Sequence, residues 1–333
     1  GNCNAVPSSK VITITSAPVV SAGSNGTVCT NNSVIALNGS VIGATGGIWS
    51  GGTGTYNPNN TTLNATYTPS AAERTAGTVT LTLTSAGNGN CNAVASNVTY
   101  TITPAPTANA GADQSLCTNN PVASLGGSVT IATGGIWSGG AGTFAPSTTN
   151  LNATYTPTAA EIASGLVTLT LTTTGNGTCI AVIDQVQLNF TPSPAADAGA
   201  DLSLCRNNAS VALGGSVTVA TGGIWSGGAG SYTPNNTTLN ATYTPTPGEL
   251  AAGTLTLTLT TTGTGNCNAV ADSRVITFTP SPTVNAGPNA TVCANNSNIT
   301  LAGAFTVSTG AQWTGGAGTY NPNNTTMNAV YTP

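Results

Sequence analysis

The chain repeats itself every 88 residues without an insertion, and this period constrains its fold more than any other feature. All four tryptophans keep the interval, at Trp49, Trp137, Trp225 and Trp313. The eight cysteines form two series with the same spacing, Cys29, Cys117, Cys205 and Cys293 in one and Cys3, Cys91, Cys179 and Cys267 in the other. A fixed period of this length predicts an array of equivalent units that each contact their neighbours.

Proline pairs mark the boundaries of these units at a constant phase. Thr103-Pro104-Ala105-Pro106 recurs as Thr191-Pro192-Ser193-Pro194 and as Thr279-Pro280-Ser281-Pro282. Such Pro-x-Pro linkers favour an extended and stiff backbone. We therefore divide the chain into the C-terminal strand of a preceding repeat (1–17), three complete repeats (18–105, 106–193 and 194–281) and a truncated fourth repeat (282–333). The sequence is accordingly expected to be a window on a longer protein.

Within one repeat the hydrophobic pattern has a period of two residues. In Val79-Thr80-Leu81-Thr82-Leu83-Thr84 aliphatic side chains alternate with threonines, which predicts a half-buried β-strand. Residues 98–102 and, less regularly, 33–41 alternate in the same way, and only residues 71–77 resemble a helical turn. A unit of this length with about seven short strands has the size of an immunoglobulin-like β-sandwich, so the fold class is predicted to be all-β.

Charged residues are scarce, and this excludes several classes of function. The 333 residues include four basic and eight acidic side chains and no His, with a net charge of −4. Without a basic face nucleic acid is not expected as a partner, and no apolar run is long enough for a membrane span. Glu73, Glu161 and Glu249 supply one acid per repeat at a single position, which indicates a capping or solvation role. We therefore expect no enzyme activity and no cofactor.

The elements of each repeat follow a recognisable order. In the second repeat it runs from Ala108-Asn109-Ala110-Gly111-Ala112-Asp113 through residues 121–126 and the Trp137 strand to Val167-Thr168-Leu169-Thr170-Leu171-Thr172. This order resembles PKD-type immunoglobulin-like domains, although Ile-Trp-Ser-Gly-Gly replaces the acidic Trp-Asp-Phe-Gly-Asp-Gly signature of that family. Tandem Thr- and Asn-rich repeats of this kind are similar to the stalks of giant surface adhesins that gliding bacteria export by a type 9 secretion system. The resemblance implies a tandem array of β-sandwich domains forming an extended rod.

Two cysteines per repeat on an uncharged, loop-rich background indicate disulfides and an oxidising compartment. No metal site is expected, because the chain has neither His nor the Cys-x-x-Cys spacing that zinc favours. The residues leave the pairing open, and the simplest pairing joins the two cysteines of one repeat, as in Cys29 with Cys91, Cys117 with Cys179 and Cys205 with Cys267. The PKD-like resemblance implies that Cys29 and Cys91 lie at opposite poles of the domain. It therefore favours bridges between successive repeats, Cys29 with Cys179 and Cys117 with Cys267.

Other repeated residues admit two interpretations. The tryptophans are interpreted as core residues, although an aromatic face also suits a sugar ring. Threonine rows such as Thr168, Thr170 and Thr172 fit a solvent-facing strand, with ice binding as the competing interpretation. Asn-x-Thr triplets such as Asn64-Ala65-Thr66 leave glycosylation open. Calcium is disfavoured because the aspartates form no Asp-x-Asp-x-Asp loop; they are Asp113, Asp184, Asp197, Asp201 and Asp272.

Together these features favour a structural stalk or filament of an extracellular bacterial surface adhesin, which holds a distal binding region away from the cell. Its expected partners are the neighbouring repeats of the same chain. One alternative is a glycan- or ice-binding array that acts by avidity. Another is a laterally self-assembling extracellular filament or sheath, because uncharged edge strands invite pairing between chains.

Overall fold

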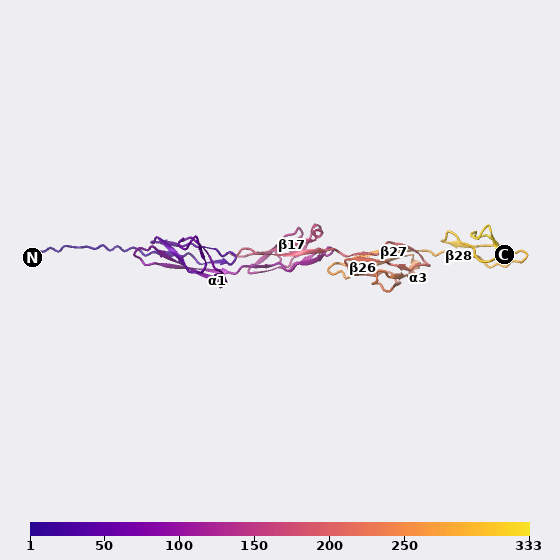
Figure 1. The fold of residues 1–333 in the computed structure, drawn as a ribbon, viewed down its shortest axis with the longest axis horizontal. Helices are drawn as coiled ribbons and strands as arrows, with labels where there is room; N and C mark the ends of the chain where they lie inside the picture. Colours follow the sequence, from indigo (N-terminus) through magenta and orange to yellow (C-terminus); the bar gives the residue numbers. More distant parts are fainter. The chain divides into compact units, whose positions relative to one another are not determined.

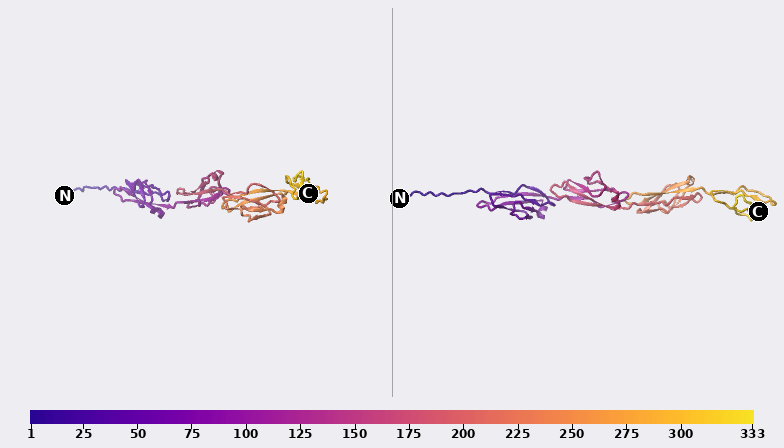
Figure 2. Two further views of the ribbon diagram at one scale, coloured as in Figure 1. Left: turned by 45° about the vertical axis from the view of Figure 1, so that its right-hand side comes forward. Right: turned by 90° about the horizontal axis from the view of Figure 1, so that it is seen from above.

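The computed structural model describes residues 1–333. The chain divides into two compact units, one of residues 1–116 and 121–191 and the other of residues 117–120 and 192–333. Within them, strand-rich bodies follow one another in the order of the sequence (Figure 1, Figure 2). None of the helices has the length and apolar character needed to pass through a bilayer.

Repeat 1 contains nine short strands and one helix of six residues. Its elements are β1 (Val19–Ser21), β2 (Gly26–Cys29), β3 (Ile35–Ala36), β4 (Ser40–Ile42), β5 (Gly46–Ser50), β6 (Thr55–Asn57), β7 (Thr66–Thr68), α1 (Ala71–Ala76), β8 (Thr78–Ala86) and β9 (Ala95–Thr103). The strands form a four-stranded sheet in the order β2-β9-β8-β5, a three-stranded sheet β3-β7-β6 and a pair β1-β4. The count exceeds the seven strands predicted because chain segments pass from one sheet to another, as between β1 and β2.

Repeats 2 and 3 reproduce this arrangement element by element. Repeat 2 has β10 (Thr107–Asn109), β11 (Gln114–Cys117), β12 (Ala123–Ser124), β13 (Ser128–Thr130), β14 (Gly134–Ser138), β15 (Thr143–Ala145), β16 (Thr154–Thr156), α2 (Ala159–Ser164), β17 (Leu166–Thr174) and β18 (Ile183–Thr191). Repeat 3 has β19 (Ala195–Asp197), β20 (Leu202–Cys205), β21 (Val211–Ala212), β22 (Ser216–Thr218), β23 (Gly222–Ser226), β24 (Ser231–Thr233), β25 (Thr242–Thr244), α3 (Pro247–Ala252), β26 (Thr254–Thr262) and β27 (Ala271–Thr279). Each repeat is an immunoglobulin-like β-sandwich, as predicted.

The two ends of the chain hold less regular structure. Residues 282–333 keep five strands, β28 (Thr283–Asn285), β29 (Ile299–Thr300), β30 (Ala304–Thr306), β31 (Thr319–Asn321) and β32 (Val330–Thr332). The strand expected in residues 1–17 is not formed, and all of these residues are exposed. A strand is stable only when another strand supplies its backbone partners, and no neighbouring strand pairs with this segment.

The alternating pattern of residues 79–84 produces the half-buried strand that it predicts. β8 pairs antiparallel with β9, and β2 pairs parallel with the far half of β9. Val79, Leu81 and Leu83 on β8 are buried, whereas Thr80 on the opposite face is exposed. Because side chains on a strand alternate between its two faces, this register directs every aliphatic residue of β8 into the sandwich.

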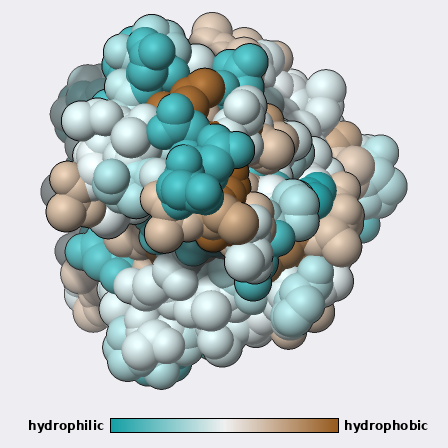
Figure 3. Space-filling view, turned by 90° about the vertical axis from the view of Figure 1, so that its right-hand side faces the viewer, coloured by the Kyte–Doolittle hydropathy of each residue, from teal (hydrophilic) through white to brown (hydrophobic).

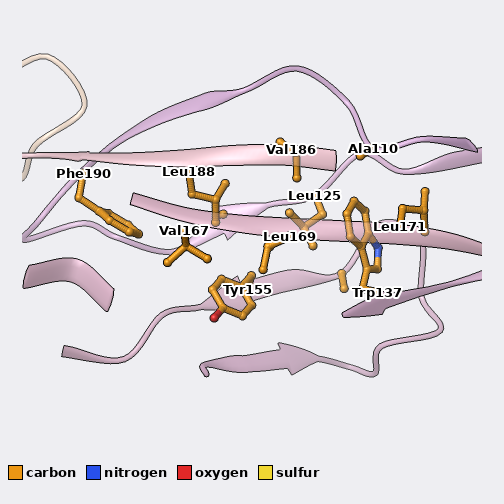
Figure 4. Packing of buried hydrophobic residues seen from close by; sticks show 12 residues of the cluster. Ala110, Leu125, Trp137, Tyr155, Val167, Leu169, Leu171, Val186, Leu188 and Phe190 are labelled. Atoms are coloured by element: carbon orange, nitrogen blue, oxygen red, sulfur yellow. The ribbon is translucent and has the colours of Figure 1, made fainter. Parts of the chain in front are cut away.

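Each sandwich has its own hydrophobic core. In repeat 2, Trp137, Tyr155, Leu169 and Leu171 are at most 1% exposed, and their side chains converge between the sheets (Figure 4). Burying one such side chain contributes about 1.5–3 kcal/mol. The core clusters of repeats 1 and 3 hold the equivalent residues, and no cluster draws on more than one repeat. The repeats therefore behave as separate sandwiches and not as one continuous solenoid.

The outer surface carries little charge. Residues of intermediate hydropathy cover much of the face in Figure 3, with hydrophilic residues between them and little strongly hydrophobic area. The low charge itself follows from the composition, in which 4% of residues are charged. A surface of this kind relies on backbone and on neutral Thr, Ser and Asn groups for its hydration.

Candidate functional site

The first candidate site is a disulfide that joins repeat 1 to repeat 2. Cys29 ends β2 and is fully buried, and its sulfur bonds to Cys179 in the loop between β17 and β18, 150 residues later. The two Cα atoms lie 4.9 Å apart, within the normal range for a bridge. Both sulfur atoms lie 3.6 Å from the carbonyl oxygen of Pro104, the linker residue between the repeats. The bridge and the linker peptide therefore meet at one point.

Two asparagines beside Cys29 hold the incoming loop through its backbone. The side chain of Asn31 donates to the carbonyl of Ile180 at 2.9 Å and accepts from the Ile180 N–H at 3.1 Å. Asn32 donates to the carbonyl of Thr178 at 3.1 Å. A side-chain amide that uses both its donor and its acceptor on one residue imitates a β-ladder pair. We call the bridge and these two amides together the joint.

A second joint has the same construction. Cys117 bonds to Cys267, again 150 residues later, and both sulfur atoms lie 3.7 Å from the carbonyl of Pro192. The Asn119 side chain exchanges two hydrogen bonds with the backbone of Asn268, whose own side chain donates to the Asn119 carbonyl, and Asn120 donates to the carbonyl of Asn266. The loop residues are Thr178 and Ile180 at the first joint but asparagines at the second. Because the contacts that the two joints share are to backbone groups of the loop, the loop can change its side chains without losing them.

Pairing within one repeat is not the arrangement in the structure. Cys29 lies beside Thr103, where β9 ends, whereas Cys91 lies before Ala95, where β9 begins. Nine strand residues at ~3.3 Å each separate these two poles, far more than the ~7 Å that a bridge can span. Four cysteines hold no bridge, namely Cys3, Cys91, Cys205 and Cys293.

A strained residue borders the first joint. Ile131 has a φ of +67° and lies at the centre of a tight turn closed by a hydrogen bond from Ala132 N–H to the Thr130 carbonyl. A β-branched residue rarely adopts this conformation, and Ile131 is nevertheless 55% exposed. It lines a hollow with Thr27 of repeat 1 and the Cys179 loop. Val219 and Val307 repeat the conformation in repeats 3 and 4, whereas repeat 1 has Gly43.

Tryptophan side chains are not available as stacking platforms in the complete repeats. Trp49, Trp137 and Trp225 are at most 1% exposed, and the indole N–H of Trp137 donates to the Leu151 carbonyl at 3.2 Å. Trp313 is half-buried. A sugar ring needs an open aromatic face, so these residues support the sandwich core and not a glycan site.

Several threonines of the rows pair with polar side chains on the neighbouring strand. On the outer face of repeat 1 the hydroxyls of Thr80 and Thr99 lie 3.0 Å apart across β8 and β9, and Thr82 donates to Asn97 at 2.8 Å. In repeat 3 the pair of Thr258 and Ser273 lies 2.8 Å apart. Hydroxyls that are paired across strands are less free to order a water lattice or bind a ligand, so the rows act first as cross-strand pairs.

The repeated glutamate fastens a one-turn helix to the sandwich. At α2 the Glu161 carboxylate accepts from Thr158 N–H, from Ala141 N–H and from the Tyr155 hydroxyl, all at 2.6–2.7 Å. Thr158 caps the helix in return, and Gly165 ends it with a φ of +81°. Burial alone would raise the pKa of this carboxyl, but the hydrogen bonds from Thr158, Tyr155 and Ala141 outweigh it and lower the pKa to about 2. The capping role predicted for Glu73, Glu161 and Glu249 is confirmed.

The aspartates act as single caps for backbone N–H groups. Asp184 accepts from Ala110 N–H at 2.7 Å, Asp113 from Gln187 N–H and Asp201 from Val275 N–H. Asp272 and Asp197 do the same for Ala198 and Gly199. The structure brings no three metal-ligating side chains together. Each carboxylate therefore has a local structural partner.

The fold and the joints define a class, namely tandem immunoglobulin-like β-sandwiches with disulfides between successive domains. No family model matches the chain, and no curated protein sequence is similar to it. A titin fragment of three immunoglobulin domains matches 80% of this chain and all of its own length, with 9% identity and a TM-score of 0.43. Extracellular cadherin domains 3–6 of protocadherin gamma B2 match 95% of this chain and 90% of their own, with 11% identity and a TM-score of 0.31. Similarity at this level does not extend to function.

Proposed function

We propose that the chain is part of a stalk of an extracellular surface adhesin, in which joined sandwiches form an extended rod that presents a distal binding region. The observation that carries this proposal is the joint, because it fastens successive domains where the linker alone would allow bending. Disulfides of this kind are stable in oxidising, extracellular compartments. The bacterial origin, the type 9 export route and the repeat boundaries at residues 105, 193 and 281 belong to the same proposal.

The two bridges overlap along the chain, which gives the proposed rod a second covalent path. Residues 117–179 belong to both disulfide loops. Tension can pass from Cys29 across the bridge to Cys179, back to Cys117 and across the second bridge. A peptide bond cut within this shared stretch leaves the two halves of the chain connected by sulfur. Scarcity of Lys and Arg further limits cleavage by trypsin-like proteases.

Stretching of single molecules tests the proposal. Through both bridges, the segment from Cys29 to Cys267 contributes about 62 residues, or ~220 Å, when it is fully unfolded, instead of about 238 residues, or ~830 Å, along the unbridged chain. We expect the shorter contour in oxidised protein and the longer one after reduction or in the double variant Cys29→Ser, Cys117→Ser. Equal contours before and after reduction would remove the bridges from the load path and with them the proposed stalk.

The alternative functions receive less support. A glycan-binding array lacks open tryptophan faces in the complete repeats, and several hydroxyls that an ice-binding array would need are engaged in cross-strand pairs. For lateral assembly into a sheath, the edge strands of the four-stranded sheets are short, four residues in β2 and five in β5. Short edges offer few backbone groups to a second chain.

A further inference from the structure

In repeat 3, Cys205 and the two asparagines after it correspond to one half of a joint, and no loop is bound to them. Cys205 ends β20, and its thiol donates to the carbonyl of Pro280 at 3.7 Å. Cys117, its bonded equivalent in repeat 2, has the same distance to the carbonyl of Pro192. The free thiol therefore lies where its equivalents form bridges, and no movement of β20 is needed to place it there.

The turn after Cys205 keeps one backbone hydrogen bond of the occupied joints, although the β-bridge that Cys29 and Cys117 form with Asn32 and Asn120 is not formed here. The N–H of Asn208 donates to the Cys205 carbonyl at 2.9 Å, as Asn120 and Asn32 do to their cysteines. Asn207 and Asn208 are exposed, and neither side-chain amide has a hydrogen-bond partner. Their equivalents Asn119 and Asn120 both bind the backbone of an incoming loop. The open turn thus presents the same donors and acceptor with nothing bound to them.

The two loops that occupy joints indicate which kind of loop would bind at Cys205. Cys179 and Cys267 each follow a Gly-x-Gly-x sequence, and the N–H of each donates to the carbonyl three residues earlier. The unbonded Cys91 has the same turn, with a 3.1 Å hydrogen bond to the Asn88 carbonyl. Loops of this shape present the cysteine together with backbone groups on either side of it. The two asparagine side chains bind these backbone groups at the occupied joints.

We propose that the turn Cys205-Arg206-Asn207-Asn208 is a docking site for the Gly-x-Gly-x-Cys loop of one further repeat of this kind. The asparagines align the loop backbone first, and the sulfur bond then forms between aligned cysteines. In this step two thiols lose two protons and two electrons to a disulfide oxidant, which becomes two thiols. The inference rests on the proposed stalk and adds that amide recognition selects the partner before the bridge closes.

A model loop tests this recognition directly. The probe is a cyclic peptide of residues 84–95 in which Cys91 carries a thionitrobenzoate leaving group, and the protein is the full chain with Cys3→Ser, Cys91→Ser and Cys293→Ser. The Cys205 thiolate attacks the peptide sulfur and releases the coloured thionitrobenzoate thiolate. Three amide hydrogen bonds should make this exchange at least about tenfold faster than with a cyclic peptide of scrambled sequence.

The matched variant replaces Asn207 and Asn208 with Ala in the same background. It should react with the native loop no faster than with the scrambled loop, while its rate with a small aromatic disulfide reagent stays unchanged. Equal rates for the two peptides, or a native-loop rate that the Ala variant preserves, would overturn the proposal. Peptide mapping of the same sample reports whether Cys29–Cys179 and Cys117–Cys267 are intact, so a failure here is distinguishable from a failure of the stalk.

Discussion

Residues 282–333 reproduce β10, β12, β13, β15 and β16 of repeat 2 but form no strand at the positions of β11 and β14. In repeat 2, β14 pairs with β17 and Trp137 is 1% exposed. Residues 310–314 correspond to β14 in sequence but form no strand, and Trp313 is only half-buried. Beside Trp313 lies a hollow lined by Gly303 and Met327. Its counterpart in repeat 2 is filled by Leu171, which lies against Gly127 and Trp137.

The two tryptophan segments differ both in their strand partner and in sequence, Gly-Gly-Ile-Trp-Ser in repeat 2 and Gly-Ala-Gln-Trp-Thr at residues 310–314. Residues 282–333 keep the sheet β29-β32-β31 and the pair β28-β30, whose partners all lie within this segment. The tryptophan strand is lost where no long strand equivalent to β17 lies beside it. Gly and Ala have weak β-propensity, so such a segment depends on a neighbouring strand for both hydrogen bonds and burial.

The largest expected effect comes from removing the tryptophan of repeat 2. Trp137→Ala should destabilise repeat 2 by about 3–5 kcal/mol, because a large side chain is removed from a closed core. Hydrogen exchange of β17 followed by mass spectrometry measures the loss. Trp313→Ala is the matched control, with a loss below about 1 kcal/mol in β31 and β32. Equal losses at both positions would show that the core of residues 282–333 is as closed as that of repeat 2.

Removing one joint should have the next largest effect. The double variant Cys117→Ser, Cys267→Ser is expected to lose about 2–4 kcal/mol of unfolding free energy, since the bridge restricts the unfolded chain over a long loop. Urea unfolding monitored by tryptophan fluorescence measures the change. Cys3→Ser with Cys293→Ser provides the control, because neither thiol is bonded, and it should leave the midpoint in place. An unchanged midpoint in the first variant would contradict a stabilising bridge.

The next effect concerns Glu161, whose carboxylate fastens α2 in repeat 2 as Glu249 fastens α3 in repeat 3. Glu161→Gln should cost about 2 kcal/mol by weakening three charge-assisted hydrogen bonds at the helix. Exchange protection of α2 reports the loss, and α3 in the same molecule serves as the internal control. If α2 and α3 lose protection equally, the effect is not local to Glu161.

The contacts of Glu161 also predict how the stability of repeat 2 depends on pH. The carboxyl of Glu161 has a pKa lowered from 4.5 to about 2, so its contribution is complete above the ordinary pKa and disappears as the pH falls from about 4.5 to about 2. Burial, followed by the bond to Glu161, raises the pKa of Tyr155 from 10.0 to about 12, so stability is also lost as the pH rises through that interval. Between these limits stability should be flat, and a titration near pH 7 in unfolding experiments would contradict it.

The smallest expected effect concerns the strained turn. Ile131→Asn should raise the stability of the turn at residues 128–134 by up to about 1 kcal/mol, because Asn tolerates a positive φ better and little burial is lost. Local exchange rates measure the gain. Repeat 1 carries Gly43 at this position and offers a natural reference without the strain. A loss of stability would show that Ile131 contributes a contact at the joint that exceeds its backbone strain.

Much of the sandwich follows from the sequence, but the joint follows only in part. The alternation in residues 79–84 predicts β8 because its two faces differ in polarity, and the phase of Glu73 predicts the cap of α1. Asn31 and Asn32 recur in every unit as the second and third residues after the cysteine, and this spacing is a usable signal. It is obscured because Asn is abundant throughout the chain. The positive φ of Ile131 has no sequence signal at all, since β-branched residues normally avoid this conformation.

The central claim is that disulfides run between successive repeats, and peptide mapping without reduction tests it most directly. Free thiols are first alkylated, and the protein is digested with pepsin at low pH so that bridges do not exchange. The account predicts linked peptides containing Cys29 with Cys179 and Cys117 with Cys267, with alkylated Cys3, Cys91, Cys205 and Cys293. Linked peptides containing Cys29 with Cys91 and Cys117 with Cys179 would contradict it.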